Sequence, residues 1–489
     1  MLKNSEILRF IKEDIVSTRK LSATRSLKYY EAEHDILNLR MFYYNADGKL
    51  VEDTTRSNVK ISHPFFTELV DQEVQYMLSG EQSFIRSKAE GLQKILDDYF
   101  DDDFKCELHE CLTGAIAKGF DYMYAYVNSQ NKLGFQHADS MGVIEVRAKD
   151  TDDGCEYIIY WYIDRIEKGK KVVKRIQVWD EEQTHYFVQV EDGKVESDDS
   201  VELNPRPHIV SVDDNGDKYG ESLGIIPFFR LDNNKKQYSG LKAVKDIIDD
   251  YDIMSCSLSN NLADFDTPIH VVKGFQGDNL DELQQNLKTK KMIGVDDNGG
   301  VEVHTVELPY EARLAKMHED EKNIYRFGMG FNSAQLGDGN ITNIVIKSRY
   351  ALLDLKCDKL EVRLKQFLKK IVAIVIDKIN QENETDYQLS DVYFTFNREV
   401  MTNALDNAQI EFQDAQTQGH LLDNILKVNA VIDDETILMN VCEILDLDWD
   451  EIKDKLPNEE EEKTNELQTA LEAVIPDDEG GVVDESTTT

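Results

Sequence analysis

Adjacent acidic residues are the groups in this chain whose type and spacing could do chemistry. Asp101-Asp102-Asp103 and Asp249-Asp250 each place carboxylates next to one another. Such pairs can hold the Mg²⁺ ion of a nuclease. Acids make up 95 of the 489 residues, however, so adjacent acids arise from composition alone. A solvated acidic face is therefore the favoured interpretation, and a Mg²⁺-dependent nuclease is a minor alternative.

Other signatures of catalysis are missing from the sequence. The Gly-Lys pairs at Gly48, Gly169 and Gly193 lack the upstream glycine of a phosphate-binding GxxxxGK[ST] loop. No GxSxG, HExxH or GxGxxG motif falls on an expected strand–helix junction. The sequence therefore predicts a protein that is not an enzyme.

Metal-binding patterns are equally weak. The six cysteines form no CxxC pair, and two of them fall in helical apolar stripes, so free buried thiols in a reducing compartment are expected. The segment DDNGDKYGESLG from Asp213 lacks the glycine at position six and the acid at position twelve of an EF-hand loop. We expect neither a metal nor a cofactor.

Composition limits the class of protein. The hydrophobic share of 41% and charged share of 31% describe a soluble protein of roughly two to four domains. The net charge of −40 argues against a surface that embraces nucleic acid or anionic lipid, although DNA could still slide through a channel without sticking. The N-terminus has no signal-peptide core, and the longest apolar run, 371–376, is too short to span a membrane. A cytoplasmic protein is expected.

Hydrophobic periodicity indicates an α+β chain. Residues 1–45 read as helical, with Leu8, Ile11 and Ile15 on one face. Further helices are predicted over 64–78, 92–99 and 107–119. From Tyr122 onward, aromatic and β-branched runs alternate with turn residues, which predicts a meander of antiparallel strands.

Residues 238–381 form the most informative stretch. Two helices, 239–265 and 309–328, surround an insert expected to be a compact β–α–β–β unit. Gly328 and Gly330 are expected to stop the second helix. A glycine-rich loop and a helix from Ile344 to Gln381, ~57 Å long, follow. Two apolar seams are predicted, through Leu241, Val244, Ile248, Tyr251, Ser255, Leu258, Leu262 and Phe265, and through Ile346, Tyr350, Leu353, Cys357, Leu360, Leu364, Phe367, Ile371 and Ile374.

The last part of the chain changes character. YFTFN is predicted to be a strand, and residues 404–456 return to helix with a break near 429–434. From Asp446 to Thr489 sixteen acids face three bases, and the segment beyond 457 lacks aromatic residues. It is expected to be a mobile tail.

In the order and spacing of these elements the chain resembles the portal (connector) proteins of tailed bacteriophages, of the siphophage type that infects Gram-positive hosts. The likeness runs from about Lys28 to Leu456 and is carried by KYYEAEHDIL, SNVKISHPFFTELVDQEVQYMLSG, GAIAKGFDYMYAYVNSQNKLGF, IIPFFRLDNNKKQYSGLKAVKDIIDDYDIMSCSLSN and GNITNIVIKSRYALLDLKCDKLE. Two features depart from the family pattern. Gln237-Tyr238 replaces the usual acid before the first stem helix, and VIDDETILMNVCEIL follows the family only loosely.

The resemblance implies a portal fold with long stem helices, a β-rich wing, a small α/β clip and a helical crown. Laid on this sequence, the parts are N-terminal helices and wing (1–237), stem helix 1 (238–266), clip (267–308), stem helix 2 (309–330), tunnel loop (331–343), long kinked wing helix (344–383), wing strand (384–403), crown (404–456) and acidic flexible tail (457–489).

The resemblance also implies a function. Such a protein forms a ring of about twelve copies at one capsid vertex of the virion, after assembly in the host cytoplasm. The ring is the channel for double-stranded DNA during packaging and ejection. Its implied partners are the large terminase subunit, a head-completion or adaptor protein, the scaffolding protein and the major capsid protein, with no membrane and no DNA sequence specificity.

Candidate site residues follow from these assignments. The tunnel loop would present uncharged groups and one acid to DNA: Asn332, Gln335, Asp338, Asn340, Thr342 and Asn343. Basic groups near the channel would be Lys316, Lys322, Arg326 and Lys347, of which the first three could instead be solvated or paired with Glu319 and Glu321. Partner-docking lysines of the clip would be Lys273, Lys288, Lys290 and Lys291.

A second structural class stays open. A cytoplasmic coiled-coil scaffold with an acidic tail would explain the helical seams. It would leave the strand meander and the clip-like insert unexplained.

Overall fold

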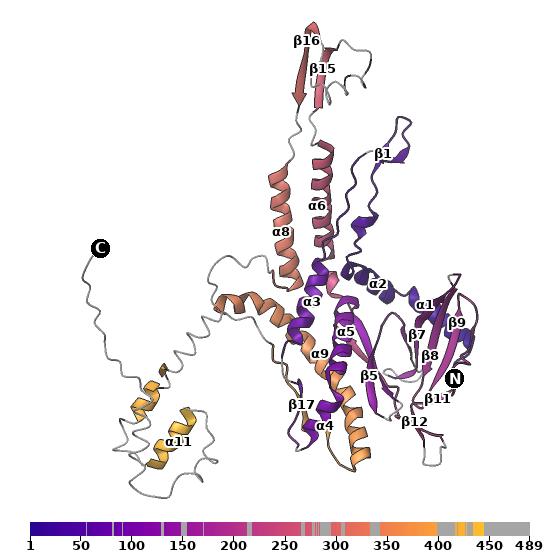
Figure 1. The fold of residues 1–489 in the computed structure, drawn as a ribbon, viewed down its shortest axis with the longest axis vertical. Helices are drawn as coiled ribbons and strands as arrows, with labels where there is room; N and C mark the ends of the chain where they lie inside the picture. The colour runs from indigo at the N-terminus through magenta and orange to yellow at the C-terminus, as the bar shows by residue number, and fades with distance from the viewer. Residues whose placement is uncertain are drawn as a thin grey trace, which may run out of the picture. The chain divides into compact units, whose positions relative to one another are not determined.

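A computed structural model describes most of the first 398 residues and parts of the remainder (Figure 1). The chain divides into two compact units, Met1–Met401 and Thr402–Thr489. The described residues are 1–54, 56–80, 83–89, 91–128, 132–147, 154–169, 171–212, 218–265, 269–275, 279, 281, 283, 295–304, 309–332, 343–398, 416–417, 419–425, 427 and 434–444.

The N-terminal segment is less helical than its pattern predicts. Helices α1 (Asn4–Ile15) and α2 (Thr18–Tyr30) are followed by a 3₁₀ turn, η1 (Asp35–Asn38), and then by a β-hairpin of β1 (Phe42–Tyr44) and β2 (Leu50–Glu52). The expected buried face of α1 is confirmed in part. Ile11 is buried and Leu8 packs against the same core, whereas Ile15 is exposed and Ile7 is buried instead, because the i, i+4 pair of Ile7 and Ile11 faces the sheet.

Three helices near the centre match their predicted positions. They are α3 (Phe65–Met77), α4 (Leu92–Tyr99) and α5 (Asp102–Lys118). Helix α5 begins five residues earlier than expected, since the Asp101 carboxylate accepts a hydrogen bond from the Phe104 N–H at 3.0 Å and caps the helix. Much of α5 is buried in the largest hydrophobic core among the described residues.

The predicted strand meander is present, but it is divided between sheets. A three-stranded sheet has the order β14-β4-β5, and a larger one has the order β10-β9-β8-β7-β6 with β11 beside β9; β12 and β13 pair separately, and every pairing is antiparallel. The strands are β4 (Phe120–Val127), β5 (Leu133–Ala138), β6 (Val143–Arg147), β7 (Cys155–Glu167), β8 (Lys171–Trp179), β9 (Gln183–Val190), β10 (Val195–Ser197), β11 (Arg206–Pro207), β12 (Ile209–Val212), β13 (Lys218–Glu221) and β14 (Phe228–Asp232).

Two helices stand side by side after the sheets (Figure 1). The first helix is α6 (Lys245–Phe265), which is preceded by a 3₁₀ turn, η2 (Gly240–Ala243). The second helix is α8 (Tyr310–Gly328), which begins after Pro309 as predicted. Strands β15 (Ile269–Phe275) and β16 (Val295–His304) form an antiparallel hairpin between them. The single strand β16 therefore replaces the last two strands of the expected β–α–β–β unit. The expected helix of that unit lies for the most part outside the described residues.

Gly328 and Gly330 are expected to end α8, but the structure gives them a packing role instead. Met329, with φ of 55°, takes the left-handed conformation that ends the helix. A Cβ atom on Gly328 would lie 2.6 Å from Leu69 Cδ1, and one on Gly330 would lie 2.2 Å from Leu69 Cδ2. These glycines therefore allow the end of α8 to approach α3 closely.

A single helix of 41 residues, α9 (Asn343–Asn383), crosses the first unit and bends along its length (Figure 1). Its predicted seam is confirmed from Leu353 onward, because Leu353, Cys357, Leu360, Leu364, Phe367, Ile371 and Ile374 are all buried. After a 3₁₀ turn, η5 (Leu389–Asp391), the predicted strand is present as β17 (Val392–Phe394), which pairs with β3 (Ile85–Ser87). Arg398 then returns to α9 and lies 2.7 Å from both Asp354 and Asp358.

The second unit is described only in part. Helix α11 (Asp434–Ile444) falls within the predicted helical range, and Cys442 is buried. Residues 429–433 of the expected break and the acidic tail beyond 457 lie outside the described residues, whereas Asp434 is the first residue of α11.

Gly119 and Gly169 have similar positive φ angles, but replacement by alanine should destabilise the protein more at Gly119. Its φ is +101°, and an added Cβ would lie 2.3 Å from the Gln237 carbonyl oxygen. We expect Gly119→Ala to lower the free energy of unfolding by ~3 kcal/mol, measured by urea denaturation followed by circular dichroism. Gly169→Ala is the matched control, since φ is +93° but no heavy atom lies within 4 Å. Its cost should stay near ~1 kcal/mol, and equal losses would contradict this account.

Candidate functional site

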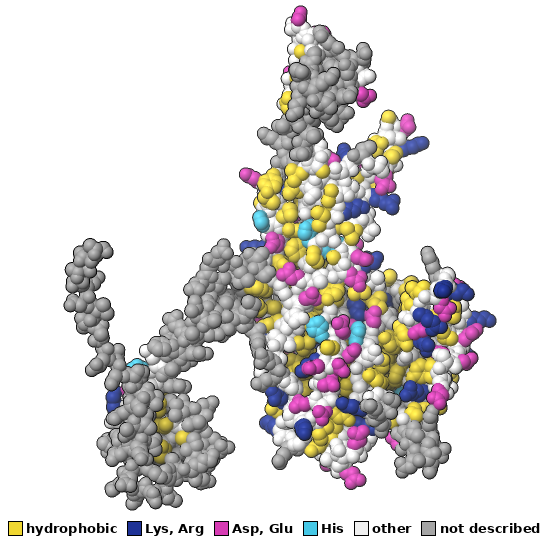
Figure 2. Space-filling view, viewed as in Figure 1, with side chains coloured by type: hydrophobic (Ala, Val, Ile, Leu, Met, Phe, Trp, Pro, Cys, Tyr) yellow, Lys and Arg dark blue, Asp and Glu magenta, His cyan; other side chains and the backbone are white. Residues whose placement is uncertain are grey.

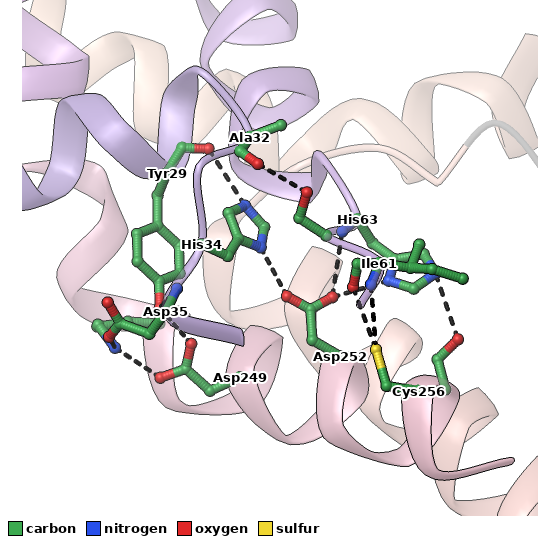
Figure 3. Close-up of polar contacts among 12 residues, drawn as sticks. Tyr29, Ala32, His34, Asp35, Ile61, His63, Asp249, Asp252 and Cys256 are labelled. Atoms are coloured by element: carbon green, nitrogen blue, oxygen red, sulfur yellow. Dashed lines mark hydrogen bonds and ion pairs between the residues drawn. The ribbon is translucent and has the colours of Figure 1, made fainter. Parts of the chain in front are cut away.

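A row of polar side chains on α6 contacts an extended segment of the chain, and Figure 3 shows the end of this row at Asp252 and Cys256. Each of four side chains, spaced one helical turn apart, accepts a hydrogen bond from a backbone N–H of residues 57–63. The pairs are Asp252 with His63 (3.1 Å), Cys256 with Ile61 (3.2 Å), Asn260 with Val59 (2.6 Å) and Asp264 with Ser57 (3.0 Å). We call these four side chains the polar ladder.

The spacing of the acceptors on α6 matches the spacing of the N–H groups on the extended segment because of elementary backbone geometry. Four residues of α-helix rise ~6.0 Å, and two residues of extended chain rise ~6.6 Å. Successive turns of α6 therefore meet alternate N–H groups of a segment that runs antiparallel to the helix. The ladder takes the place of a neighbouring strand for residues 57–63, which satisfies donors that would otherwise be left without partners.

Two imidazoles enclose the carboxylate at one end of the ladder. Asp252 is fully buried and lies 2.6 Å from His34 Nδ1 and 2.7 Å from His63 Nδ1. Burial opposes ionisation of Asp252, but hydrogen bonds from the two histidines outweigh it and hold its pKa below the ordinary value. Asp252 thus ties η1, the extended segment and α6 together as a carboxylate.

A second contact fixes α2 to the start of α6. The Tyr29 hydroxyl donates to the Asp249 carboxylate, and Lys245 Nζ lies 2.6 Å from Asp249 and 2.8 Å from Asp35. Burial and the neighbouring carboxylate raise the pKa of Tyr29. Asp249 is thereby committed to a structural contact.

The predicted apolar seam of α6 is confirmed only near its start. Leu241, Val244 and Ile248 are buried, whereas Leu262 is exposed. Farther along, the buried positions are polar: Asp252, Cys256 and Asn260. An apolar periodicity could not reveal this face, since its signal is one acceptor at every fourth residue, opposite a segment 189 to 207 residues away in the sequence.

The candidate basic residues divide into paired and exposed groups. Lys316 Nζ bonds to the Asp320 carboxylate and lies 2.6 Å from Asp250, so its acidic neighbours are not the expected Glu319 and Glu321. Lys322 and Arg326 are exposed on α8. Lys347 belongs to α9, but its side chain lies outside the described part of the chain.

The candidate loop and clip residues are described only at their edges. Asn332 donates a hydrogen bond to Glu321 at 2.9 Å, and Gln72 holds both the N–H and the carbonyl of Phe331. Lys273 pairs with Glu302 at 2.7 Å. Asn343 is the first residue of α9. Gln335, Asp338, Asn340, Thr342, Lys288, Lys290 and Lys291 lie outside the described residues.

Four of the five acids considered for a Mg²⁺ site have structural partners, and the fifth, Asp103, is exposed. Asp101 caps α5, Asp102 lies 3.0 Å from Lys105, and Asp250 pairs with Lys316. The run GESLG at Gly220–Gly224 has the letters of a nucleophile elbow, but it starts in the strand of a β-hairpin, and Ser222 Oγ donates to the Glu181 carbonyl at 2.6 Å. Within the described ranges, no three His, Cys, Asp or Glu side chains are grouped so as to hold a metal ion.

The cysteines are free thiols, as expected, although not all are buried. Cys111, Cys256, Cys357 and Cys442 are buried, whereas Cys106 is exposed and Cys155 half-buried. Burial raises the pKa of Cys357 to about 12, so this thiol stays protonated.

None of the helices in the described part of the chain is both long and apolar enough to cross a membrane.

The architecture is a helix-and-sheet body that carries a pair of long helices, with a two-stranded antiparallel pair between them in the sequence. The family model described as phage portal protein, SPP1 Gp6-like, matches residues 10–464. The chain therefore belongs to that family of phage portal proteins. It is 27% identical over 384 residues to the portal protein of Bacillus phage SPP1, covering 78% of this chain and 74% of the relative. It is 24% identical over 415 residues to the portal protein of Clostridium phage phiCD119, covering 81% and 86%.

Asp252→Ala tests the polar ladder. The substitution leaves the His63 N–H and two imidazoles without their carboxylate, so the free energy of unfolding should fall by about 3 kcal/mol at pH 7. Because the folded state lowers the pKa of Asp252, its contribution is present above the ordinary carboxyl pKa and is lost as pH falls. The difference between wild type and variant should therefore shrink below about pH 4.

Glu319→Ala, at an exposed acid on α8, is the control and should change stability by less than ~0.5 kcal/mol. Urea denaturation at several pH values measures both variants. A difference between wild type and Asp252→Ala that stays constant down to pH 3 would contradict the role given to the carboxylate.

Proposed function

We propose that this chain is the subunit of a ring, of about twelve copies, at one vertex of a phage capsid. The ring would be the channel through which double-stranded DNA is packaged and later ejected, and the platform on which the terminase and head-completion proteins dock. The family match over residues 10–464 is the observation that carries the proposal. Scaffolding and major capsid proteins would be the neighbours of the ring in the virion.

The parts of the fold receive roles within this proposal. Helices α6 and α8 would form the stem, and the hairpin β15–β16 would belong to the clip that meets partners. Residues 331–343 would be the tunnel loop, and α9 would be the long wing helix. The side-by-side placement of α6 and α8, with the hairpin joining them, supports these roles (Figure 1).

The charge distribution suits a channel that does not trap DNA. Each phosphate neutralised by a protein cation releases counterions and tightens binding, so many unpaired lysines would hold the duplex. On α8, Lys316 is already paired with Asp250 and Asp320, which leaves Lys322 and Arg326 as exposed cations of that helix. In a chain of net charge −40 such sparse cations would guide DNA weakly.

The other hypotheses account for less of the molecule. A coiled-coil scaffold offers no role for the two larger β-sheets or the β15–β16 hairpin. A Mg²⁺-dependent nuclease would need acids grouped around the metal, and within the described ranges no three His, Cys, Asp or Glu side chains are grouped in that way. Asp101, Asp249 and Asp250 serve as cap or ion-pair partners.

Electron microscopy and native mass spectrometry of the purified full-length chain test the proposal directly. We expect closed rings with a central hole and one dominant subunit number. Dimers or trimers joined only through helices would favour the scaffold hypothesis. Monomers that cleave DNA, with cleavage lost on replacing one acidic pair, would favour the nuclease.

Deleting residues 333–342 tests whether the proposed tunnel loop acts in DNA passage and not in ring assembly. Phe331 stacks on Tyr350 at 4.7 Å and is held by Gln72, so the deletion is placed beyond this anchored residue. Ring formation should persist, while DNA packaging in an assay with the partner terminase should fall at least tenfold. Phe331→Ala, with the loop intact, is the control for loss of the anchor. Loss of the ring in the deletion variant would refute the tunnel-loop assignment.

A further inference from the structure

The β1–β2 hairpin exposes most of its apolar side chains. Five residues on its two strands are large and hydrophobic, and each is exposed: Phe42 52%, Tyr43 47%, Tyr44 74%, Leu50 58% and Val51 37%. Figure 2 shows hydrophobic atoms at the tip of this projection beside α6. Leu37, Leu39, Val59 and Ile61 extend the exposed apolar surface along its base.

A hairpin of this kind needs a further contact to be stable. An isolated two-stranded hairpin is at best marginal in water, and it gains stability when it packs against a helix or another strand. Both faces of β1–β2 are exposed here, because the burial pattern of each strand is exposed at all three positions. The side chains that would cover it are therefore not supplied by the described part of the same subunit.

The base of the hairpin is nevertheless held firmly. The polar ladder binds residues 57–63 to α6, and Lys60 Nζ donates to the Leu37 carbonyl at 2.9 Å, which joins the two legs. A segment with a fixed base and an uncovered apolar tip is pre-organised for docking, since little conformational freedom is lost on binding.

The local charge of the hairpin allows a second copy of this chain, which the proposed ring places beside it, to be the partner. Copies with a net charge of −40 repel one another, so contact costs least where the local charge balances. Residues 36–62 carry three acids and four bases: Asp47, Glu52, Asp53, Arg40, Lys49, Arg56 and Lys60. The bases at the hairpin already sit near acids, with Arg40 3.7 Å from Glu52 and Arg56 3.2 Å from Asp53. The hairpin thus presents apolar side chains within a nearly neutral surface.

We propose that the β1–β2 hairpin of one subunit docks on the neighbouring copy of the same chain, which makes it an intersubunit clasp anchored by the polar ladder. This inference rests on the proposed ring. A ring needs a heterologous contact in which one surface of each copy meets a different surface of the next. A hairpin that projects from its own subunit beside the proposed stem supplies one half of such a contact.

Photo-cross-linking of the purified, assembled full-length chain tests the clasp. A benzophenone amino acid replaces Tyr44 in one preparation and Ile166 in another, because Ile166 is also exposed but lies at the end of β7. After irradiation, the Tyr44 position should give covalent dimers on a denaturing gel at several times the yield of the Ile166 position. Equal yields, or cross-links only within one chain, would overturn the proposal.

A second measurement uses side-chain polarity. The double substitution Phe42→Ser and Tyr44→Ser should raise the protein concentration needed for half-maximal ring assembly by roughly tenfold, because hydrophobic anchors dominate interface energies. Ile166→Ser should leave that concentration unchanged, and circular dichroism checks that both variants fold. Rings as stable as wild type in the double variant would overturn the clasp while leaving the portal proposal intact. A wild-type chain that forms no ring would instead remove the portal proposal itself.

Discussion

The match between a helical turn and two extended residues is the constraint on which this subunit depends. Acceptors at every fourth position of α6 meet the N–H groups of Ser57, Val59, Ile61 and His63, so an isolated stretch of extended chain lies against a helix without a sheet. This arrangement brings residues from the beginning of the chain to the helix pair at its middle. Both the position of the β1–β2 hairpin and the burial of Asp252 between two histidines follow from it.

The rest of the first unit is held by apolar packing around α5 and α9. Both helices contribute to one continuous core that also takes residues from α3, β4 and β14. Gly328 and Gly330 let the end of α8 approach Leu69 on α3, which connects the helix pair to that core. Polar contacts specify how α6 is placed, and hydrophobic burial supplies most of the stability behind it.

The acidic character of the chain has two structural uses. Some carboxylates are tied to particular cations or caps, as Asp249 is to Lys245 and Asp101 is to the start of α5. The remainder contribute to a net charge of −40, which suits a protein proposed to let DNA pass without gripping it. Acidic pairs that resemble catalytic sites in the sequence are therefore better explained by packing and charge balance.

The sequence by itself determined the α+β class, the positions of α3, α4, α8 and α9, and the resemblance to phage portal proteins. Those features depend on local signals, such as Pro64 and Pro309 before two helices and the seam from Leu353 to Ile374. The tertiary structure alone decided the polar ladder, the partners of Lys316 and the packing role of Gly328. Each of these joins residues distant in sequence or depends on side-chain direction in space. The acceptors at every fourth residue of α6 do not indicate which distant segment they bind, so the hydrogen bond from His63 to Asp252 could not be predicted.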